Sequence, residues 1–223
     1  MSLPPPTRER KLCYVTDRKA LAGAADEQLR LLLEKIASVA RAGVDWIQIR
    51  EKDLSGRALS EFVREAVRRV PAACRILVND RLDVACATDA AGVHLGEQSL
   101  PVAEVKRFWR ERMRGGEFLV GVSTHSLEGA MQAEDGSADY VIFGPVFATP
   151  SKAKFGEPQG IARLADVCER ARLPVIAIGG ITMENAEECV RAGAAGIAAI
   201  RLFQEAEDVG AVTRELRASF RSE

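Results

Sequence analysis

Residues 174–203 read PVIAIGGITMENAEECVRAGAAGIAAIRLF, and this stretch decides the fold class. Two apolar runs, 174–180 and 196–203, flank a segment in which Thr182 can cap a helix that ends at Gly193. Runs that are apolar on both faces are typical of buried parallel strands, and parallel neighbours need a crossover helix. The stretch therefore predicts a strand–helix–strand unit.

The same alternation continues toward the amino terminus. Further apolar runs predict strands over 11–17, 45–51, 75–80, 92–96, 118–124 and 140–146. Between them, residues 26–42 and 55–70 carry apolar side chains at helical spacing. Gly43 is placed to end the first helix, Ser55 is placed to cap the second, and Pro101 fits the first turn of a later one. The chain thus consists of eight strand–helix units.

Eight units favour a single (β/α)8 TIM barrel, an α/β fold for which 223 residues are near the lower end of the usual length. A doubly wound open sheet is the rival, but no GxGxxG turn follows the first predicted strand. We expect residues 1–10 to be a disordered or tag-derived lead and residues 11–223 to be one catalytic domain. The loop over 147–160 is rich in Gly, Pro and Lys and suggests a lid over a ligand.

Composition narrows the function classes. The chain holds 31 basic and 32 acidic residues, so it has no electrostatic footprint for nucleic acid or an anionic membrane. No apolar run approaches the length that spans a bilayer, and the start is too polar for a signal peptide. Five cysteines without a CxxC pair predict buried thiols, which suits the reducing cytoplasm. The cysteines are Cys13, Cys74, Cys86, Cys168 and Cys189.

Polar side chains gather where the predicted strands end. In a TIM barrel these ends and the loops that follow them build the active site. The main candidates are Gln48, Arg50, Lys52, Asn79, Asp80, His94, Ser123, His125, Thr149, Ser151, Lys152 and Arg201. The sequence therefore predicts a site at one rim of the barrel.

Gln48, Arg50 and Lys52 are spaced by two, so strand alternation points them to one face, inward if Trp46 is a lower-layer residue. Two cations inside a barrel are costly unless an anion meets them, which predicts phosphate binding. An ion pair with Glu51 or Asp80, or a solvated strand end, is the alternative.

Gly179-Gly180 follows an apolar strand and precedes Thr182, which suggests a phosphate cradle of backbone N–H groups. The loops after the last two strands of this fold are its usual phosphate site. A plain turn that needs glycine is the alternative.

Asp80 could hold a divalent cation, although a lone Asp at a strand end also commonly caps a helix. His125 is a candidate acid–base residue, and local hydrogen bonding is the alternative. For His94 we expect local hydrogen bonding. Trp46 and Trp109 are expected to be packing residues.

Ordered motifs across nearly the whole chain resemble the thiamine phosphate synthase and thiazole tautomerase superfamily. They are YVTD, VDWIQIREKD, ILVNDRLDVA, GVHLGE, GVSTHS, ADYVIFGPVFATPSK, PVIAIGGIT and AGAAGIAAI. Similarity to the synthase branch implies a TIM-barrel transferase that joins 4-amino-2-methyl-5-(diphosphomethyl)pyrimidine to thiazole phosphate. The products would be thiamine phosphate and diphosphate.

The resemblance also implies roles for residues. The pyrimidine diphosphate would be bound by Gln48, Arg50, Lys52, Asn79, Ser123 and Lys152, and the thiazole phosphate by Thr149, Ser151, Gly180, Ile200 and Arg201. Arg50, Lys52, Lys152 and His125 would be the catalytic residues. Asp80 would bind Mg²⁺, the implied cofactor. Small phosphorylated molecules would be the only partners, and a homo-oligomer is compatible with this reading.

Two departures from the synthase pattern keep alternatives open. Ser99 occupies the place of an Asp that is a second Mg²⁺ ligand, and Glu97 lies two residues away from it. Arg201 replaces a small hydroxyl residue. The tautomerase branch also lacks that Asp and uses a His such as His125 for proton transfer. A non-catalytic binder of thiazole phosphate or thiamine phosphate is the third reading.

Overall fold

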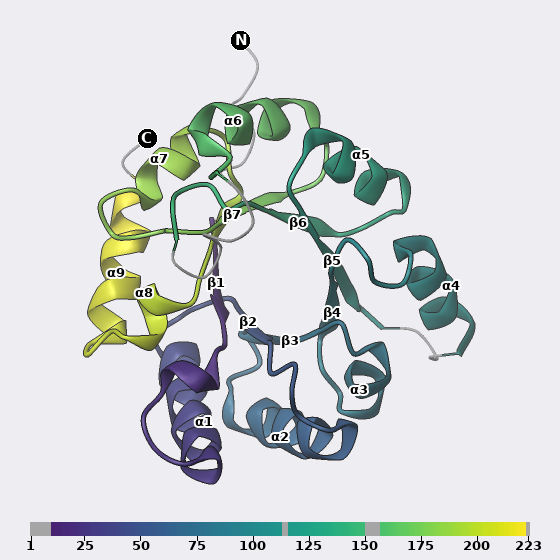
Figure 1. Ribbon diagram of the computed structural model, residues 1–223, viewed down its shortest axis with the longest axis vertical. Helices are drawn as coiled ribbons and strands as arrows, with labels where there is room; N and C mark the ends of the chain where they lie inside the picture. Colours follow the sequence, from purple (N-terminus) through teal and green to yellow (C-terminus); the bar gives the residue numbers. More distant parts are fainter. Residues whose placement is uncertain (1–9, 113–115, 150–156, 222–223) are drawn as a thin grey trace.

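The fold is a closed barrel of parallel strands surrounded by helices. The computed structural model describes residues 10–112, 116–149 and 157–221. Strands β1 to β8 pair in sequence order, and β8 pairs with β1 to close the ring. Figure 1 looks into this ring and shows the helices around its outside. The predicted (β/α)8 TIM barrel is therefore confirmed.

Strands and helices alternate along the chain. The strands are β1 Lys11–Val15, β2 Trp46–Ile49, β3 Arg75–Asn79, β4 Gly92–Leu95, β5 Leu119–Thr124, β6 Tyr140–Phe143, β7 Val175–Ile178 and β8 Gly196–Ala199. The helices are α1 Ala25–Arg41, α2 Gly56–Arg69, α3 Leu82–Ala87, α4 Val102–Arg112, α5 Leu127–Asp135, α6 Gly160–Arg170, α7 Ala186–Arg191, α8 Arg201–Gln204 and α9 Val209–Ser219. A short 3₁₀ helix, Arg18–Ala20, follows β1.

Two apolar layers hold the barrel together. The larger layer fills the space between strands and helices, with Leu32, Phe62 and Val93 among its buried members. The smaller layer fills the inside of the ring and includes Trp46 and Tyr140, whose ring centroids lie 4.6 Å apart. Trp46 is a packing residue at the inner layer, as expected. Strands buried on both faces explain the continuous apolar runs of the sequence.

Helix ends follow their local chemistry. Ser55 caps α2 as predicted, because its hydroxyl oxygen accepts a hydrogen bond from the Ala58 amide at 3.2 Å. Gly43 adopts a positive φ of 93° directly after the C-cap of α1. Trp109 on α4 stacks on Phe118 at 3.9 Å, so it too is a packing residue.

Two sequence expectations were wrong in the last third of the chain. The strand expected over 196–203 ends at Ala199, and α8 begins at Arg201, so Arg201 opens a helix instead of continuing a strand. The helix expected to start at Thr182 begins at Ala186. Asn185 closes a turn in between, since its side chain accepts from the Thr182 amide and donates to the Gly180 carbonyl.

The lead expected over 1–10 falls almost wholly outside the described residues. Arg10, its last residue, donates to the Ala194 carbonyl at 3.1 Å. Within the described part of the chain, no helix is both long and apolar enough for a membrane crossing.

Candidate active site at the carboxyl ends of the strands

The end of β2 carries one buried polar side chain, Gln48, and is followed by two exposed cations, Arg50 and Lys52. Gln48 is buried, with 3% of its surface exposed. β2 ends at Ile49, so Arg50 and Lys52 follow the strand and are exposed. The argument from strand alternation therefore applies to Gln48, whereas Arg50 and Lys52 lie beyond the strand. Neither forms an ion pair with Glu51, which pairs with Arg18 instead.

A buried network fixes the backbone that carries these two cations. Glu51 accepts from the Thr16 hydroxyl at 2.7 Å and from the Arg18 guanidinium at 2.9 Å. Arg18 also donates hydrogen bonds to both carboxylate oxygens of Asp53, at 2.7 and 2.8 Å. These bonds hold the pKa of Asp53 well below its usual value. The Arg50 amide donates to the Thr16 hydroxyl at 3.0 Å. Residues on both sides of Lys52 are thus anchored to Thr16 and Arg18, in the segment that follows β1.

Inside the ring, Gln48 reaches the end of β3. Its Nε2 donates to Asn79 Oδ1 at 2.9 Å, and the Asn79 amide nitrogen lies 3.3 Å from Asp80 Oδ2. The Gln48 Oε1 atom is buried and has no hydrogen-bond partner among the described residues. A buried acceptor without a donor is costly, so this atom is suited to receive an N–H from a ligand.

Asp80 and Ser99 meet at the ends of β3 and β4. Asp80 has a positive φ of 63°, and its carboxylate accepts from the Ser99 hydroxyl and, at 3.3 Å, from the Gly96 amide. Glu97 is turned to β5, where it accepts from the His125 amide at 3.1 Å. Of the two residues considered beside Asp80, Ser99 is therefore the one in contact with it. The described residues hold no cluster of three or more His, Cys, Asp or Glu that could bind a metal by themselves.

His94, on β4, lies inside the barrel and contacts side chains of β5 and β6. Its Nε2 is 2.9 Å from the Ser123 hydroxyl and its Nδ1 is 3.1 Å from the Tyr140 hydroxyl. The expected local hydrogen bonding of His94 is thus confirmed. Burial lowers the pKa of His94 to about 3, so the ring is neutral near pH 7. Burial also raises the pKa of Tyr140, which keeps its hydroxyl protonated.

His125 is likewise held by local contacts. Its Nδ1 is hydrogen-bonded to the Gly144 carbonyl in the turn after β6. Since that carbonyl accepts, Nδ1 carries the proton in this contact. In a neutral ring Nε2 is then a hydrogen-bond acceptor, so this contact is compatible with the acid–base role of His125 as well as with the local one.

The loops after β6, β7 and β8 come together on the other side of the mouth. Phe147 donates from its amide to the Gly179 carbonyl at 3.0 Å. A Cβ on Gly180, where φ is 65°, would lie 2.5 Å from the Ala148 carbonyl, so only glycine fits there. The Arg201 guanidinium lies 3.4 Å from the Thr149 hydroxyl. Thr149, Gly180, Ile200 and Arg201 are thus neighbours, whereas Ser151 and Lys152 lie outside the described residues.

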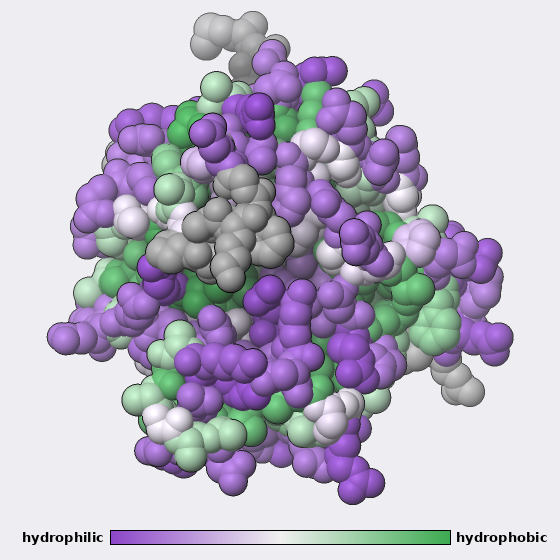
Figure 2. All heavy atoms as spheres, in the orientation of Figure 1, coloured by the Kyte–Doolittle hydropathy of each residue, from purple (hydrophilic) through white to green (hydrophobic). Residues whose placement is uncertain are grey.

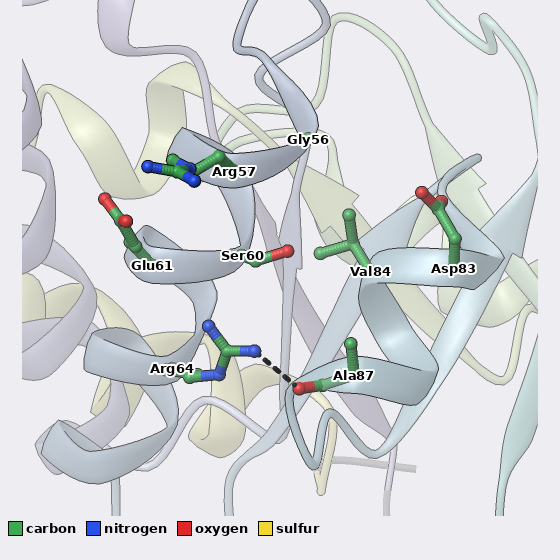
Figure 3. A pocket seen from close by; sticks show the side chains of 8 residues that line it. All are labelled: Gly56, Arg57, Ser60, Glu61, Arg64, Asp83, Val84 and Ala87. Atoms are coloured by element: carbon green, nitrogen blue, oxygen red, sulfur yellow. Dashed lines mark hydrogen bonds between the residues drawn. The ribbon is translucent and has the colours of Figure 1, made fainter.

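Two surface hollows lie away from these residues. A groove of about 500 Å³ separates α2 from α3, and Arg64 donates to the Ala87 carbonyl across it at 3.0 Å (Figure 3). A second hollow of about 380 Å³ is lined by Asp45, Arg217 and residues of the opposite strand ends. Neither contains a predicted site residue. Figure 2 shows hydrophilic residues gathered around the centre of the face seen in Figure 1.

Sequence reasoning missed the residues that support the site. The sequence suggests Glu51 only as a possible ion-pair partner, and nothing in it draws attention to Arg18 or Tyr140. Glu51 is 4% exposed and Arg18 is 7% exposed, which is rare for charged side chains. No sequence signal separates such residues from exposed ones, because the pairing joins positions 33 residues apart.

Comparison with known proteins agrees with this geometry. The family model described as thiamine monophosphate synthase matches residues 12–203. The chain belongs to this family. The thiamine-phosphate synthase of Roseiflexus sp. (strain RS-1) is 40% identical over 211 residues, which cover 92% of this chain and 82% of that protein. The thiamine-phosphate synthase of Shouchella clausii is 39% identical over 202 residues, 90% of this chain and 94% of that one.

A solved structure supports membership of the same family. The thiamine phosphate pyrophosphorylase of Pyrococcus furiosus superposes with a TM-score of 0.80 at 32% identity and covers 96% of both chains. A 3-hexulose-6-phosphate synthase superposes with a TM-score of 0.71 at 21% identity, a likeness of fold alone. The resemblance inferred from the motifs is therefore confirmed.

Proposed function

We propose that this protein is a thiamine-phosphate synthase, the transferase that joins 4-amino-2-methyl-5-(diphosphomethyl)pyrimidine to thiazole phosphate. One observation carries the proposal beyond family membership. The polar side chains of β2, β3, β4 and β5 converge inside an otherwise apolar ring, beside Arg50 and Lys52, which lack ion-pair partners among the described residues. Buried polar groups suit a pyrimidine, and the two cations suit the diphosphate attached to it.

Arg50 and Lys52 are placed to hold the diphosphate and to lower the barrier to its departure. The bond between the pyrimidine methylene carbon and the diphosphate oxygen breaks, and the electron pair leaves with diphosphate. The methylene carbon becomes cationic, and the thiazole nitrogen then attacks it. Fixed cations stabilise the charge that grows on the leaving oxygen. We assign Lys152 to the same group on the resemblance alone.

Gln48, Asn79 and Ser123 would bind the pyrimidine diphosphate. The unpartnered Oε1 of Gln48 can accept a hydrogen bond from the amino group of the pyrimidine. The Asn79 contact fixes the Gln48 amide in this orientation, since its Nε2 is already used. The mouth would thereby align the two reactants and save much of the entropy of their encounter.

Thr149, Gly180, Ile200 and Arg201 would receive the thiazole phosphate, together with Ser151. The Arg201 guanidinium lies 3.4 Å from the Thr149 hydroxyl, and a cation at this side of the mouth supports phosphate binding there. Arg201 stands where the family has a small hydroxyl residue. Its guanidinium can grip two phosphate oxygens at once.

Asp80 fits a role as a Mg²⁺ ligand, with the Ser99 oxygen beside it. One exposed carboxylate and one hydroxyl are a sparse set, but Mg²⁺ commonly uses few protein ligands and takes the rest from water and substrate phosphates. When bound, Mg²⁺ would neutralise part of the diphosphate charge. Asp80 itself would contribute the anionic oxygen that retains the ion at the mouth.

The synthase is favoured over the two alternatives by specific observations. A tautomerase handles no diphosphate, so Gln48, Lys52 and Asp80 would have no role in it. A simple binder of thiazole phosphate would not need Arg50, Lys52 and Asp80 on the opposite side of the mouth. The named relatives are synthases.

The test is diphosphate release from both substrates, with and without Mg²⁺. We expect release only with both substrates and Mg²⁺, and a loss of at least about a hundredfold in Asp80→Ala. Asp166→Ala, which removes an exposed carboxylate on α6, is the matched control and should keep the wild-type rate. An unchanged rate in Asp80→Ala would overturn the metal role, and no release by the wild type would overturn the synthase.

The same proposal includes the compartment and the partners of the protein. Five free cysteines among the described residues fit a reducing cytoplasm. Small phosphorylated molecules would be the partners.

A further inference from the structure

Three side chains form a hydrogen-bonded line inside the barrel. Tyr140 from β6 contacts His94 Nδ1 at 3.1 Å, and His94 Nε2 contacts the Ser123 hydroxyl on β5 at 2.9 Å. Tyr140 and His94 are each 1% exposed, while Ser123 is partly exposed. The line therefore leads from the dry interior of the barrel to its mouth.

The packing holds the Tyr140 hydroxyl in place. The Tyr140 ring lies against Trp46 at 4.6 Å between centroids, and against the His94 ring at 5.6 Å. Gly121 on β5 makes room for it, because a Cβ there would overlap the Tyr140 ring and hydroxyl. The close approach of Tyr140 to His94 thus depends on a residue without a side chain.

Burial fixes the direction of each hydrogen bond. No described residue other than His94 lies within hydrogen-bond reach of the Tyr140 hydroxyl. A buried O–H without an acceptor is costly, so Tyr140 donates to Nδ1. A neutral imidazole carries one proton, and Nδ1 is an acceptor, so the proton is on Nε2. Nε2 then donates to the Ser123 oxygen.

Ser123 is left with its own proton unused. Its oxygen already accepts from His94, and no other described residue accepts from it. With the opposite tautomer of His94, Ser123 would donate inward and offer the mouth only lone pairs. The polarity of the line therefore decides whether Ser123 is a donor at the mouth.

We propose that Tyr140 and His94 are positioning residues that orient the Ser123 hydroxyl so that it donates to an acceptor atom of the pyrimidine diphosphate. This inference rests on the proposed synthase function for the identity of the acceptor. The direction of the line itself rests only on the contacts and burial given above.

The tautomer can be read without any activity. The chain has two histidines, so a ¹⁵N–¹H spectrum of histidine-labelled protein contains two rings, and His94→Gln assigns them. We expect the Nε2–H form for His94 in the wild type and a mixture of tautomers in Tyr140→Phe. An Nδ1–H form in the wild type would overturn the proposal, and so would an unchanged tautomer in Tyr140→Phe.

The rate of diphosphate release tests whether the Ser123 hydroxyl donates to the substrate. Ser123→Ala should lower the rate of diphosphate release by about tenfold to a hundredfold, as expected for a lost hydrogen bond to a charged group. Tyr140→Phe should lower it by about threefold to tenfold, and the double variant should be no slower than Ser123→Ala. A loss in the double variant equal to the product of the two single losses would overturn the proposal that Tyr140 acts through Ser123.

A second buried tyrosine supplies the matched control. The Tyr14 hydroxyl donates to Gln204 at 2.7 Å, away from Ser123. Any loss in Tyr14→Phe should therefore multiply with that of Ser123→Ala. Failure of the synthase proposal would appear differently, as an inactive wild type whose His94 tautomer is still Nε2–H.

Discussion

At the scale of single residues, burial keeps His94 neutral in the barrel interior, and this makes the free energy of unfolding depend on pH. His94 is fully buried, and burial lowers its pKa to about 3, whereas the same side chain in the unfolded chain titrates near 6.5. The charge of Asp80 opposes this shift but does not cancel it. Between these two pH values the unfolded chain binds a proton that the native protein does not.

This difference predicts a pH-dependent stability. Because the unfolded chain binds more protons, the free energy of unfolding falls as the pH is lowered from about 6.5 toward 3. The slope from one such group approaches 1.4 kcal/mol per pH unit. Denaturant unfolding between pH 7 and 5, above the ordinary range of carboxyl groups, measures it. His94→Gln should flatten the slope there, and an equally steep slope in that variant would refute the assignment.

At the scale of elements, several strands approach their neighbours through glycine. A Cβ on Gly92 of β4 would overlap the Leu119 carbonyl, and one on Gly196 of β8 would overlap the Lys11 carbonyl. Gly121 of β5 faces the Tyr140 ring instead. These glycines permit close backbone or ring contacts that no other residue allows.

Two glycine-to-alanine substitutions compare the effect of crowding a buried ring with the effect of helix propensity alone. Gly121→Ala should lower the free energy of unfolding by about 1–3 kcal/mol, because the added methyl must displace the buried Tyr140 ring. Gly56→Ala at the start of α2 meets only the flexible end of Arg81 and should be neutral or slightly stabilising. Chemical denaturation of both variants measures the contrast. Equal effects would show that the ring moves freely.

At the scale of the whole molecule, the barrel and its helices shield the thiols. Burial raises the pKa of Cys74 and Cys189 to about 12 and that of Cys168 to about 11. Thiolate is the reactive form, so these groups are almost wholly unreactive at neutral pH. Their reactivity therefore reports on opening of the fold.

Alkylation should follow unfolding. At pH 8 we expect iodoacetamide to leave Cys13, Cys74 and Cys189 unmodified in the native protein and to modify all five cysteines in denaturant. Partly exposed Cys86 should react before them. Mass spectrometry over time measures the order. Fast native labelling of Cys13 or Cys189, which are fully buried, would contradict the described core.

The sequence alone determined the fold class and most of the rim. Eight apolar runs separated by helical periods specify parallel strands with crossover helices, since hydrophobic periodicity is a local property. Polar residues at the ends of these runs, such as Gln48 and Asn79, had to meet at one rim because all strands of the barrel run the same way. The motifs identified the family for the same reason: they are contiguous.

The tertiary structure decided what depends on register and on contacts between distant positions. It ended β8 before Arg201, turned Glu97 to His125, and joined Arg18 to Glu51. It also placed Tyr140, one of many apolar-looking strand residues, in contact with His94, 46 positions away. Burial and hydrogen-bond partners are properties of the packed barrel, so no local pattern in the chain encodes them one residue at a time.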